Sequence, residues 1–562
     1  MKHIVITTFL IVALCFGASF IRAPNIGAVG NNESRNLNIQ PKTKIPSPYF
    51  ISQIPDMRST AGSAGKNIVF AEEGQNVAVI YGRFSGDQVN IMQTYVAYST
   101  DRGNSWVHYG PLSTFNSRRT YPAIDAEDNW PQTGMVQFGW HQAAQITGSY
   151  DSSPAFYAKE VMYPDGLITS AFRLPNSGIR DVWEPCIGVK DSFVIITAVN
   201  NGCFHSWFDV YIWRTTDYGE SWDTGRVFLP GLIHYYGPHF RFGSNGYMFF
   251  LWMQELETNP DLYWPYYCES FDYALTWTEP RPIVQPDTTT AWWYYYDCEV
   301  VRDTPVATVR LGTGINYGEI WVFRPDSGGP GNWRFKGKKL IDDSVGPPFY
   351  VQCPTVAADD SGSIFIGYQA IFVTPSDTGP DIGLFVRPAW KDTWVDWGRI
   401  TYNTGNLEEN HLEFAHNAPI VGTYPNDSVI IGMIYHNAGD YPNTGNLYFD
   451  WFAIPYDSIR RFQGITEMNP NYFKEFAITV APNPFRNSVK FRFPFYTGKA
   501  KLSIFDVSGK LIRELTTNNK PPKTEFVWDS RKNDGSLANP GVYFYNISSG
   551  GNRYRGKVIL TR

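Results

Sequence analysis

The feature that most constrains the fold is a unit that recurs through the middle of the chain. Each copy has a short entry, an apolar strand, a turn and a second apolar strand, as in EPCIGVKDSFVIITAV from residue 184. Seven positions anchor the copies: Gly65, Pro122, Pro185, Pro238, Asp297, Pro354 and Pro419. Their residue numbers place successive anchors 57, 63, 53, 59, 57 and 65 residues apart. The chain is therefore expected to repeat one structural unit.

A period of this size holds four short strands, which is the blade of a β-propeller. The aromatic share of 16%, with 49 Gly and 39 Pro, is typical of short strands joined by turns and excludes a helical solenoid. We therefore predict an all-β fold, with a propeller of seven four-stranded blades over residues 45–460. Six blades remain open if the first or last unit is a partial or closing element.

A second motif recurs late in the units, where a third strand should turn into a fourth. It reads STDRGNSW at 99–106, TTDYGESW at 215–222 and SFDYALTW at 270–277. Its acid can accept backbone amides in a turn, its glycine allows a positive φ, and its tryptophan can cover the hairpin. The residues concerned are Asp101, Gly103, Trp106, Asp217, Gly219, Trp222, Asp272 and Trp277. Ala274 replaces the glycine in the third copy and predicts a distorted turn, and Asp326 marks a degenerate fourth copy.

This motif resembles the Asp-box of sialidase-like and related propellers. The resemblance implies that the boxes lie on the blade periphery, away from the central site. A carboxylate that is occupied by turn donors and repeats around a ring is a poor proton carrier. We therefore expect Asp217 and its counterparts to be architectural rather than catalytic.

Ligands of propellers usually meet one axial end of the channel, and we expect it near the beginning of the innermost strands. Residues around the anchors are then the candidates for binding: Arg119, Tyr121, Glu184, His239, Asp297 and His416. The neighbouring runs DVWEP and WWYYYDCE are rich in acids and aromatics, which suit sugar rings. The prediction is a protein that binds an extracellular glycan or another protein.

An exo-acting glycoside hydrolase of the sialidase-like group is the alternative. The resemblance would then imply three arginines gripping a carboxylate, a Tyr/Glu nucleophile pair and an Asp acid/base. PDMRST at 55–60 lacks the family's Arg-Ile-Pro-like element, and spacing selects no triad among the arginines, so we assign no catalytic residue. Glu184 with Asp297 would act as a retaining pair only with carboxyls about 5 Å apart. An adhesion or surface-layer component is a third alternative.

Other chemistries find little support in the sequence. Without CxxC, HExxH, GxSxG or a Walker motif in a fitting context, we expect no metal and no cofactor. The net charge of −6 disfavours nucleic acid as a partner. After the N-terminal segment five cysteines remain, at 186, 203, 268, 298 and 353, and we expect them to be buried free thiols.

The N-terminus has the features of a cleaved signal peptide, which we place at residues 1–23. Lys2 and His3 precede the apolar run IVITTFLIVALCFGASF, and a polar stretch follows. No comparable run occurs later, so we expect no transmembrane segment after cleavage. Residues 24–44 are expected to be a linker before the propeller.

After a second linker at 461–474 the chain changes character. Residues 475–562 alternate apolar positions and turns over about seven short strands, which predicts a small Ig-like β-sandwich. Its distinctive residues are Asn483, Pro484, Asp506, Gly509, Trp528, Gly541 and Tyr543.

These elements resemble the type A, FlgD-like C-terminal sorting domain of type IX secretion cargo. Ser530 departs from that pattern, which favours glycine. The resemblance implies that the type IX machinery is a partner and that the protein is secreted or displayed on the outer surface of a Gram-negative-type bacterium.

Overall fold

The computed structural model forms two compact units. The larger ends at Phe462 and the smaller begins at Gln463, also taking in residues 343–349 and 373–378. The structure describes residues 20–22, 49–54, 65–71, 74–85, 88–112, 121–127, 130–132, 134–141, 144–146, 149–152, 154–162, 167–175, 182–200, 208–233, 238–256, 259–284, 292–312, 318–343, 348–372, 380–401, 410–421, 427–437, 445–460, 479–492, 500–507, 509–516, 525–549 and 552–561. Both predicted linkers, Arg119 and most of the predicted signal peptide lie outside these residues.

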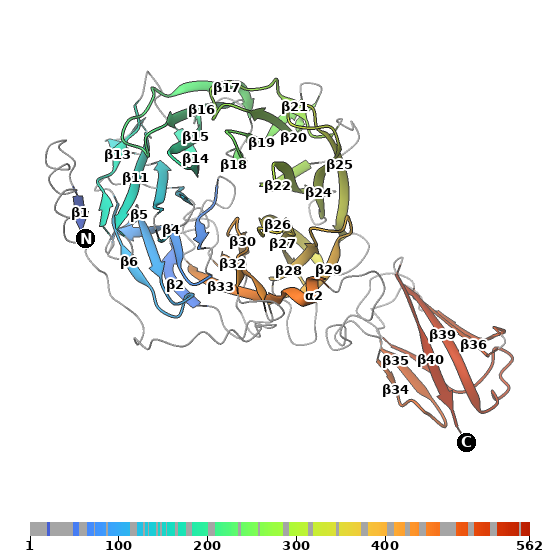
Figure 1. Ribbon diagram of the computed structural model, residues 1–562. Coiled ribbons are helices and arrows are strands. Elements are labelled where there is room, and N and C mark those ends of the chain that lie inside the picture. The colour runs from blue at the N-terminus through green and yellow to red at the C-terminus, as the bar shows by residue number, and fades with distance from the viewer. Residues whose placement is uncertain are drawn as a thin grey trace. The chain divides into compact units, whose positions relative to one another are not determined.

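The described residues of the larger unit form a ring of seven antiparallel blades, which confirms the propeller (Figure 1). One strand pair joins blades 3 and 4 into a single eight-stranded sheet. Blade 1 consists of β3 (Ile68–Phe70), β4 (Val77–Ser85), β5 (Gln88–Ser99) and β6 (Val107–Tyr109), and blade 2 of β7 (Ala123–Ala126), β8 (Val136–His141), β11 (Ala155–Met162) and β12 (Leu167–Thr169). Blade 3 consists of β14 (Val182–Lys190), β15 (Phe193–Asn200), β16 (Phe208–Thr215) and β17 (Arg226–Ile233), and blade 4 of β18 (His239–Phe242), β19 (Met248–Leu256), β20 (Asn259–Ser270) and β21 (Arg281–Pro282). Blade 5 consists of β22 (Trp292–Val301), β23 (Thr304–Gly312), β24 (Gly318–Ser327) and β25 (Arg334–Asp342), and blade 6 of β26 (Phe349–Ala358), β27 (Ile364–Ile371), β28 (Pro380–Arg387) and β29 (Val395–Arg399). In blade 7 the innermost strand is in two pieces, β30 (Asn410–Phe414) and β31 (Ile420–Val421), and β32 (Ser428–His436), β33 (Gly445–Pro455) and β2 (Tyr49–Ile54) follow outward. Blade 2 also carries β1 (Phe20–Arg22) and β13 (Phe172–Arg173), β9 (Ala144–Ile146) pairs with β10 (Ser149–Ser152), and α2 (Tyr456–Arg460) follows β33.

The ring closes because a strand from before blade 1 completes blade 7. β2 pairs antiparallel with β33, with Tyr49 opposite Phe449, and becomes the outermost strand of that blade. The last blade thus takes its inner strands from one end of the propeller sequence and its outer strand from the other. This pairing ties the chain that leads into blade 1 to the last blade.

The repeat differs from our expectation in its last unit. The sequence predicts Pro419 as the anchor, but this residue lies between β30 and β31, in a break of the innermost strand. Glu413 instead lies at the level of the other anchors. Its carboxylate accepts the backbone N–H of Asn67, and the next residue, Phe414, donates its N–H to Thr355 at 3.1 Å. Measured from Pro354 to Glu413, the final spacing is 59 residues, which lies within the range of the other spacings.

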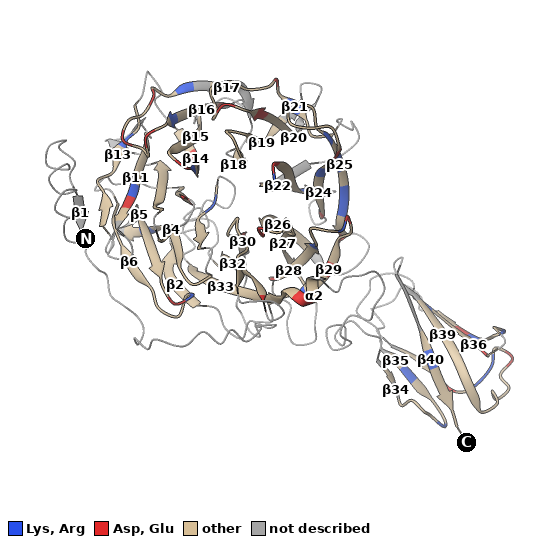
Figure 2. Ribbon diagram, in the orientation of Figure 1, with Lys and Arg blue, Asp and Glu red and all other residues tan. Residues whose placement is uncertain are grey.

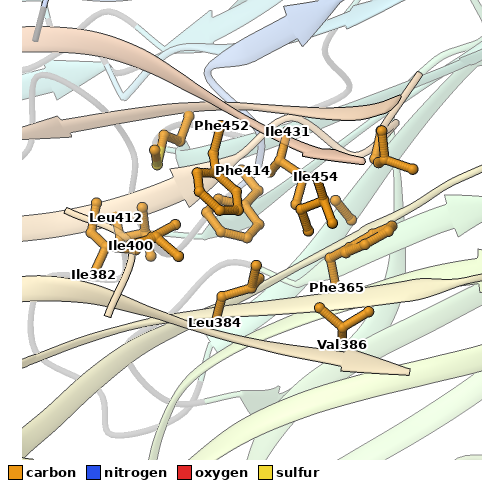
Figure 3. Packing of buried hydrophobic residues seen from close by; sticks show 14 of the residues in the cluster. Phe365, Ile382, Leu384, Val386, Ile400, Leu412, Phe414, Ile431, Phe452 and Ile454 are labelled. Carbon is orange, nitrogen blue, oxygen red and sulfur yellow. The ribbon is translucent and has the colours of Figure 1, made fainter. Parts of the chain in front are cut away.

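Neighbouring blades are held together by apolar side chains from facing sheets. Between blades 6 and 7, Phe365 and Leu384 pack with Phe414 and Phe452, all with exposures of 1% or less (Figure 3). A Cβ on Gly367 would come within 2.2 Å of the Phe414 ring. The period-2 pattern of the strands places such residues on both sheet faces, because each blade is covered on both sides.

The turns after the third strands of blades 1, 3 and 4 hold the Asp-box motifs. In blade 3 the Asp217 carboxylate accepts the Thr215 hydroxyl at 2.6 Å and the Ser221 amide at 2.9 Å. Partial burial acts to raise the pKa of Asp217, but the hydrogen bonds from Ser221 and Thr215 outweigh it and lower the pKa. Hydroxyl donors two residues before and four after the acid supplement the backbone amides, a detail that we did not expect.

The third copy keeps this hydrogen-bond pattern despite its alanine. Asp272 accepts Ser270 at 2.9 Å and the Thr276 amide at 2.8 Å, and Ala274 takes a φ of 65°. The turn is therefore not rearranged, which corrects the expected distortion. Asp326 lies within β24 and accepts the hydroxyl of Ser327, so the degenerate copy does not span a comparable turn.

The box tryptophans pack against the preceding blade. Trp222 lies edge-on to Tyr157 of blade 2, with ring centroids 4.8 Å apart. Trp106 makes the same kind of contact with Phe449 of blade 7, at 5.5 Å. A Cβ on Gly219 would lie 2.1 Å from the Tyr157 hydroxyl, so the glycine is needed for packing as well as for its φ of 81°. The motif therefore stabilises the boundary between blades.

We expect Asp217→Asn to lower the free energy of unfolding by about 1–2 kcal/mol, because an amide cannot accept all of these donors. Gly219→Ala should cost more, since it adds strain and a clash with Tyr157. Urea unfolding followed by tryptophan fluorescence measures both. Asp326→Asn is the matched control and should change the free energy by less than about 0.5 kcal/mol. A folded, equally stable Asp217→Asn protein that lost ligand binding would contradict the architectural role.

Blade 5 carries cations along its outermost strand. Arg334, Lys336 and Lys338 alternate along β25 and are exposed, while Lys339 pairs with Glu319 at 2.8 Å (Figure 2). Charged side chains on an edge strand discourage pairing with another chain. Protection of the edge strand β25 therefore explains why these cations are exposed along it.

The smaller unit contains two sheets of three and four strands. They are β34 (Thr479–Ala481), β35 (Val489–Arg492) and β38 (Glu525–Trp528), and β37 (Leu511–Thr516), β36 (Ala500–Phe505), β39 (Gly541–Ser549) and β40 (Asn552–Leu560). The Trp528 ring is fully buried against Phe485 and Tyr543. This is the predicted small sandwich.

Its distinctive residues have local structural roles. Asn483, which precedes Pro484, accepts the Ile559 amide at 2.9 Å and so binds the last strand. Asp506 accepts the Lys510 amide at 3.0 Å across a turn that contains Gly509. Ser530 takes a φ of 60°, which explains why glycine is favoured there.

The described cysteines at 186, 268, 298 and 353 are buried and free, and Cys203 lies outside the described residues. No helix among the described residues is long and apolar enough to span a membrane.

Candidate site in the propeller channel

A buried polar network crosses the channel at the level of the anchors. Innermost strands of different blades contribute one side chain each: Lys66 comes just before β3, His239 from β18, Asp297 from β22 and Thr355 from β26. The Lys66 ammonium binds the Asp297 carboxylate, and Thr355 donates to the same carboxylate at 3.0 Å. His239 Nδ1 lies 3.3 Å from the other oxygen.

The network keeps Asp297 ionised. Burial would raise the pKa of its carboxyl, but Lys66, and then His239, outweigh burial and hold the pKa well below its usual range. The backbone amides of Val356 and Cys298 each donate to Asp297 at 2.9 Å. A carboxylate with so many partners is poorly suited to exchange protons with a ligand. The Asp297 carboxylate instead joins blades 1, 4, 5 and 6 through its contacts with Lys66, His239 and Thr355.

Aromatic rings gather where innermost strands begin. Tyr121, just before β7, stacks on His141 with centroids 5.0 Å apart, and Trp183 of β14 stacks on both. Tyr121 is buried, whereas Trp183 is half-buried, so Trp183 is the more exposed ring of the stack. On the blade 6 strand Tyr350 is 41% exposed.

The backbone at this end adopts a conformation that is unfavourable for residues other than glycine. Six non-glycine residues near the beginnings of innermost strands have φ between 32° and 57°: Tyr121, Glu184, Tyr295, Tyr350, Cys353 and His411. In β14 and β22 the strand pairing shifts register at these positions. Bulges and positive φ values cluster at functional sites, where they re-aim side chains.

The predicted binding residues fall into separate groups. His239 and Asp297 meet in the buried network, while Tyr121 and Glu184 lie at the strand beginnings. His416 follows β30 and lines a cavity at the strand ends. Arg119 lies outside the described residues.

Sequence reasoning missed Lys66, Thr355, Glu413 and Trp183. Lys66 and Thr355 each directly follow an anchor, as His239 does. The spacing could therefore have found them. Glu413 could not be found in this way, because the anchor of the last unit was misplaced.

The C-terminal unit identifies the class of protein. Residues 479–561 match the family model of the secretion system C-terminal sorting domain. The protein is therefore a β-propeller exported by the type IX secretion system, secreted or placed on the outer surface of a Bacteroidetes-type bacterium. The sorting domain implies engagement with that secretion machinery.

The propeller resembles several solved structures at low sequence identity. No curated protein sequence matches the chain. A Dyadobacter fermentans protein of unknown function is 14% identical, with a TM-score of 0.36, over 59% of this chain and 94% of its own. An α-L-arabinofuranosidase of Fusarium graminearum is 14% identical, with a TM-score of 0.37, over 60% and 98%. Polysaccharide lyase Uly1 is 9% identical, with a TM-score of 0.42, over 68% and 89%.

Proposed function

We propose that this exported propeller binds an extracellular glycan at the end of its channel where the innermost strands begin. The observation that carries the proposal is the stack of Tyr121, His141 and Trp183, which presents the half-buried Trp183 as its more exposed ring. An aromatic face supported from behind by two other rings is rigid and offers apolar area to the C–H face of a sugar.

Polar groups beside the stack support the same ligand class. Glu184 directly follows Trp183, and its positive φ marks a bulge that breaks the alternation of the strand. Sugars need hydrogen-bonding groups next to an aromatic platform, because their hydroxyls are otherwise desolvated without partners. Export to the cell exterior places the protein where glycans are abundant.

We expect Trp183→Ala to reduce glycan affinity at least about tenfold, since aromatic anchors contribute about 2 kcal/mol or more at binding sites. A glycan array identifies the ligand, and calorimetry with that glycan measures the change. Trp390→Ala is the matched control, because Trp390 is 46% exposed in the turn between β28 and β29 and should leave affinity unchanged. Equal binding by the Trp183→Ala protein and the unmodified protein would overturn the proposal.

Glycoside hydrolysis is the second candidate, and Glu413 is the observation that favours it. Burial raises the pKa of Glu413 to about 7, and its Oε2 atom has no hydrogen-bond partner in the structure. Such a carboxyl can hold or release a proton near neutral pH. Turnover of a panel of fluorogenic aryl glycosides, including a sialoside, that disappears in Glu413→Gln would establish this activity. No turnover of any member leaves binding as the function.

A further inference from the structure

A cavity of about 400 Å³ opens at the ends of the innermost strands, away from the aromatic stack. Each of the seven blades contributes residues to its wall. The polar side chains of its wall include Asp125 of β7, Arg241 of β18, Glu299 of β22 and His416 after β30. Tyr121, His141 and Trp183 are not among the lining residues. The volume is in the range of small-molecule sites.

Several buried polar atoms that line this cavity lack hydrogen-bond partners in the structure. Arg241 is only 7% exposed, yet its Nε and one terminal nitrogen donate to no acceptor, and its nearest carboxylate oxygen, on Glu299, is 3.6 Å away. Glu299 Oε2 and Asn417 Oδ1 are acceptors without donors. Residues of the cavity wall therefore carry unused donors and unused acceptors together, and leaving such groups unpaired is costly.

The charged groups among these four residues are of both signs, one guanidinium and two carboxylates. Arg241 faces the carboxylates of Glu299 and Asp125, and His416 lies between those carboxylates, with its Nε2 3.6 Å from Asp125 and its Nδ1 3.9 Å from Glu299. Burial and the charge of Arg241 lower the pKa of His416 to about 3, so its ring is neutral. An anionic ligand could satisfy Arg241 but would meet two carboxylates. An ammonium ligand would leave the guanidinium unpaired.

A hydroxyl group both donates and accepts, so neighbouring hydroxyls can accept from Arg241 while donating to Glu299 and Asn417. We infer that the strand-end cavity is a second ligand site, which takes a neutral polyhydroxylated molecule of monosaccharide size. This site is distinct from the glycan site proposed at the strand beginnings and does not depend on it.

The test is calorimetric titration of the full chain with glucose, galactose, mannose and xylose, and with glucuronate and glucosamine as charged counterparts. Saturable binding of at least one neutral sugar, with weaker or no binding of its charged counterparts, is expected. Ala126→Leu and Ala358→Leu each extend a side chain that lines the cavity without removing a polar group, and each should abolish the binding. Arg241→Lys should weaken it.

Trp183→Ala separates the two sites, because it removes the aromatic platform and leaves the cavity wall intact. It should retain the monosaccharide binding that Ala126→Leu loses. Absence of saturable binding by every neutral sugar would overturn the inference, as would binding that Trp183→Ala removes and both leucine variants keep. Circular dichroism spectra and melting temperatures of the leucine variants show whether they fold, and each variant that folds tests the inference separately.

Discussion

Replacing Asp297 with alanine is expected to lower the free energy of unfolding by about 3–5 kcal/mol, the largest effect of any single substitution proposed for this protein. The substitution leaves the Lys66 ammonium buried, 3% exposed, without its counter-ion. It also removes the acceptor of Thr355 and of two backbone amides. Denaturant unfolding monitored by tryptophan fluorescence measures the loss.

Two further variants show whether the stability lost by Asp297→Ala comes from leaving a buried charge unpaired. Lys66→Met combined with Asp297→Ala removes both charges and should recover part of the stability lost by Asp297→Ala alone. Asp392→Ala is the control. Its carboxylate is 88% exposed and pairs with Arg324 and Arg387 near the surface, so the change should be under about 1 kcal/mol. Equal losses for Asp297→Ala and Asp392→Ala would contradict the importance of the network.

The same network predicts that the stability of the folded protein falls at acid pH. The folded-state pKa of Asp297 is lowered, so its contribution to stability is fully present above the unfolded-state pKa of about 3.9 and is lost as the pH falls below that value. The unmodified protein should therefore lose more stability between pH 5 and pH 3 than Asp297→Asn loses. A parallel decline of the two proteins would show that Asp297 is not the titrating group.

Deleting residues 475–562 is expected to abolish export while leaving the propeller in the cell. The deletion removes the whole of the segment 479–561 that matches the sorting domain. The blades have their own buried cores, and none of the described residues of this segment belongs to them, so the propeller should still fold. Cell fractionation and immunoblotting should find the truncated chain inside the outer membrane and none at the surface or in the medium.

Asp217→Asn in the full chain is the control for this experiment, because a modest loss of propeller stability should not prevent sorting. Its amount at the surface and in the medium should match that of the unmodified protein. Export of the truncated chain at the level of the full chain would show that the C-terminal domain is dispensable. Loss of the truncated chain from every fraction would indicate failed folding, so recovery of a protease-resistant propeller from the periplasm is part of the expected result.

The sequence alone predicted a propeller of seven or six blades, the small C-terminal sandwich and the sorting domain. These features depend on local patterns: alternating strands, Asp-box turns, and turns such as the one in which Asp506 accepts the Lys510 amide. Period and turn chemistry can be recognised in a single sequence, because each blade must cover its neighbours with the same apolar faces.

Only the tertiary structure decided which residues meet in the channel. Lys66 and Asp297 are 231 positions apart, and His416 approaches Asp125 and Glu299 from a different blade. No spacing rule separates an anchor residue that points into the network from one that lines the cavity, because a bulge of one residue changes the face of the strand. The sequence therefore determined the ring, while the closing of the ring determined the charges and cavities at its axis.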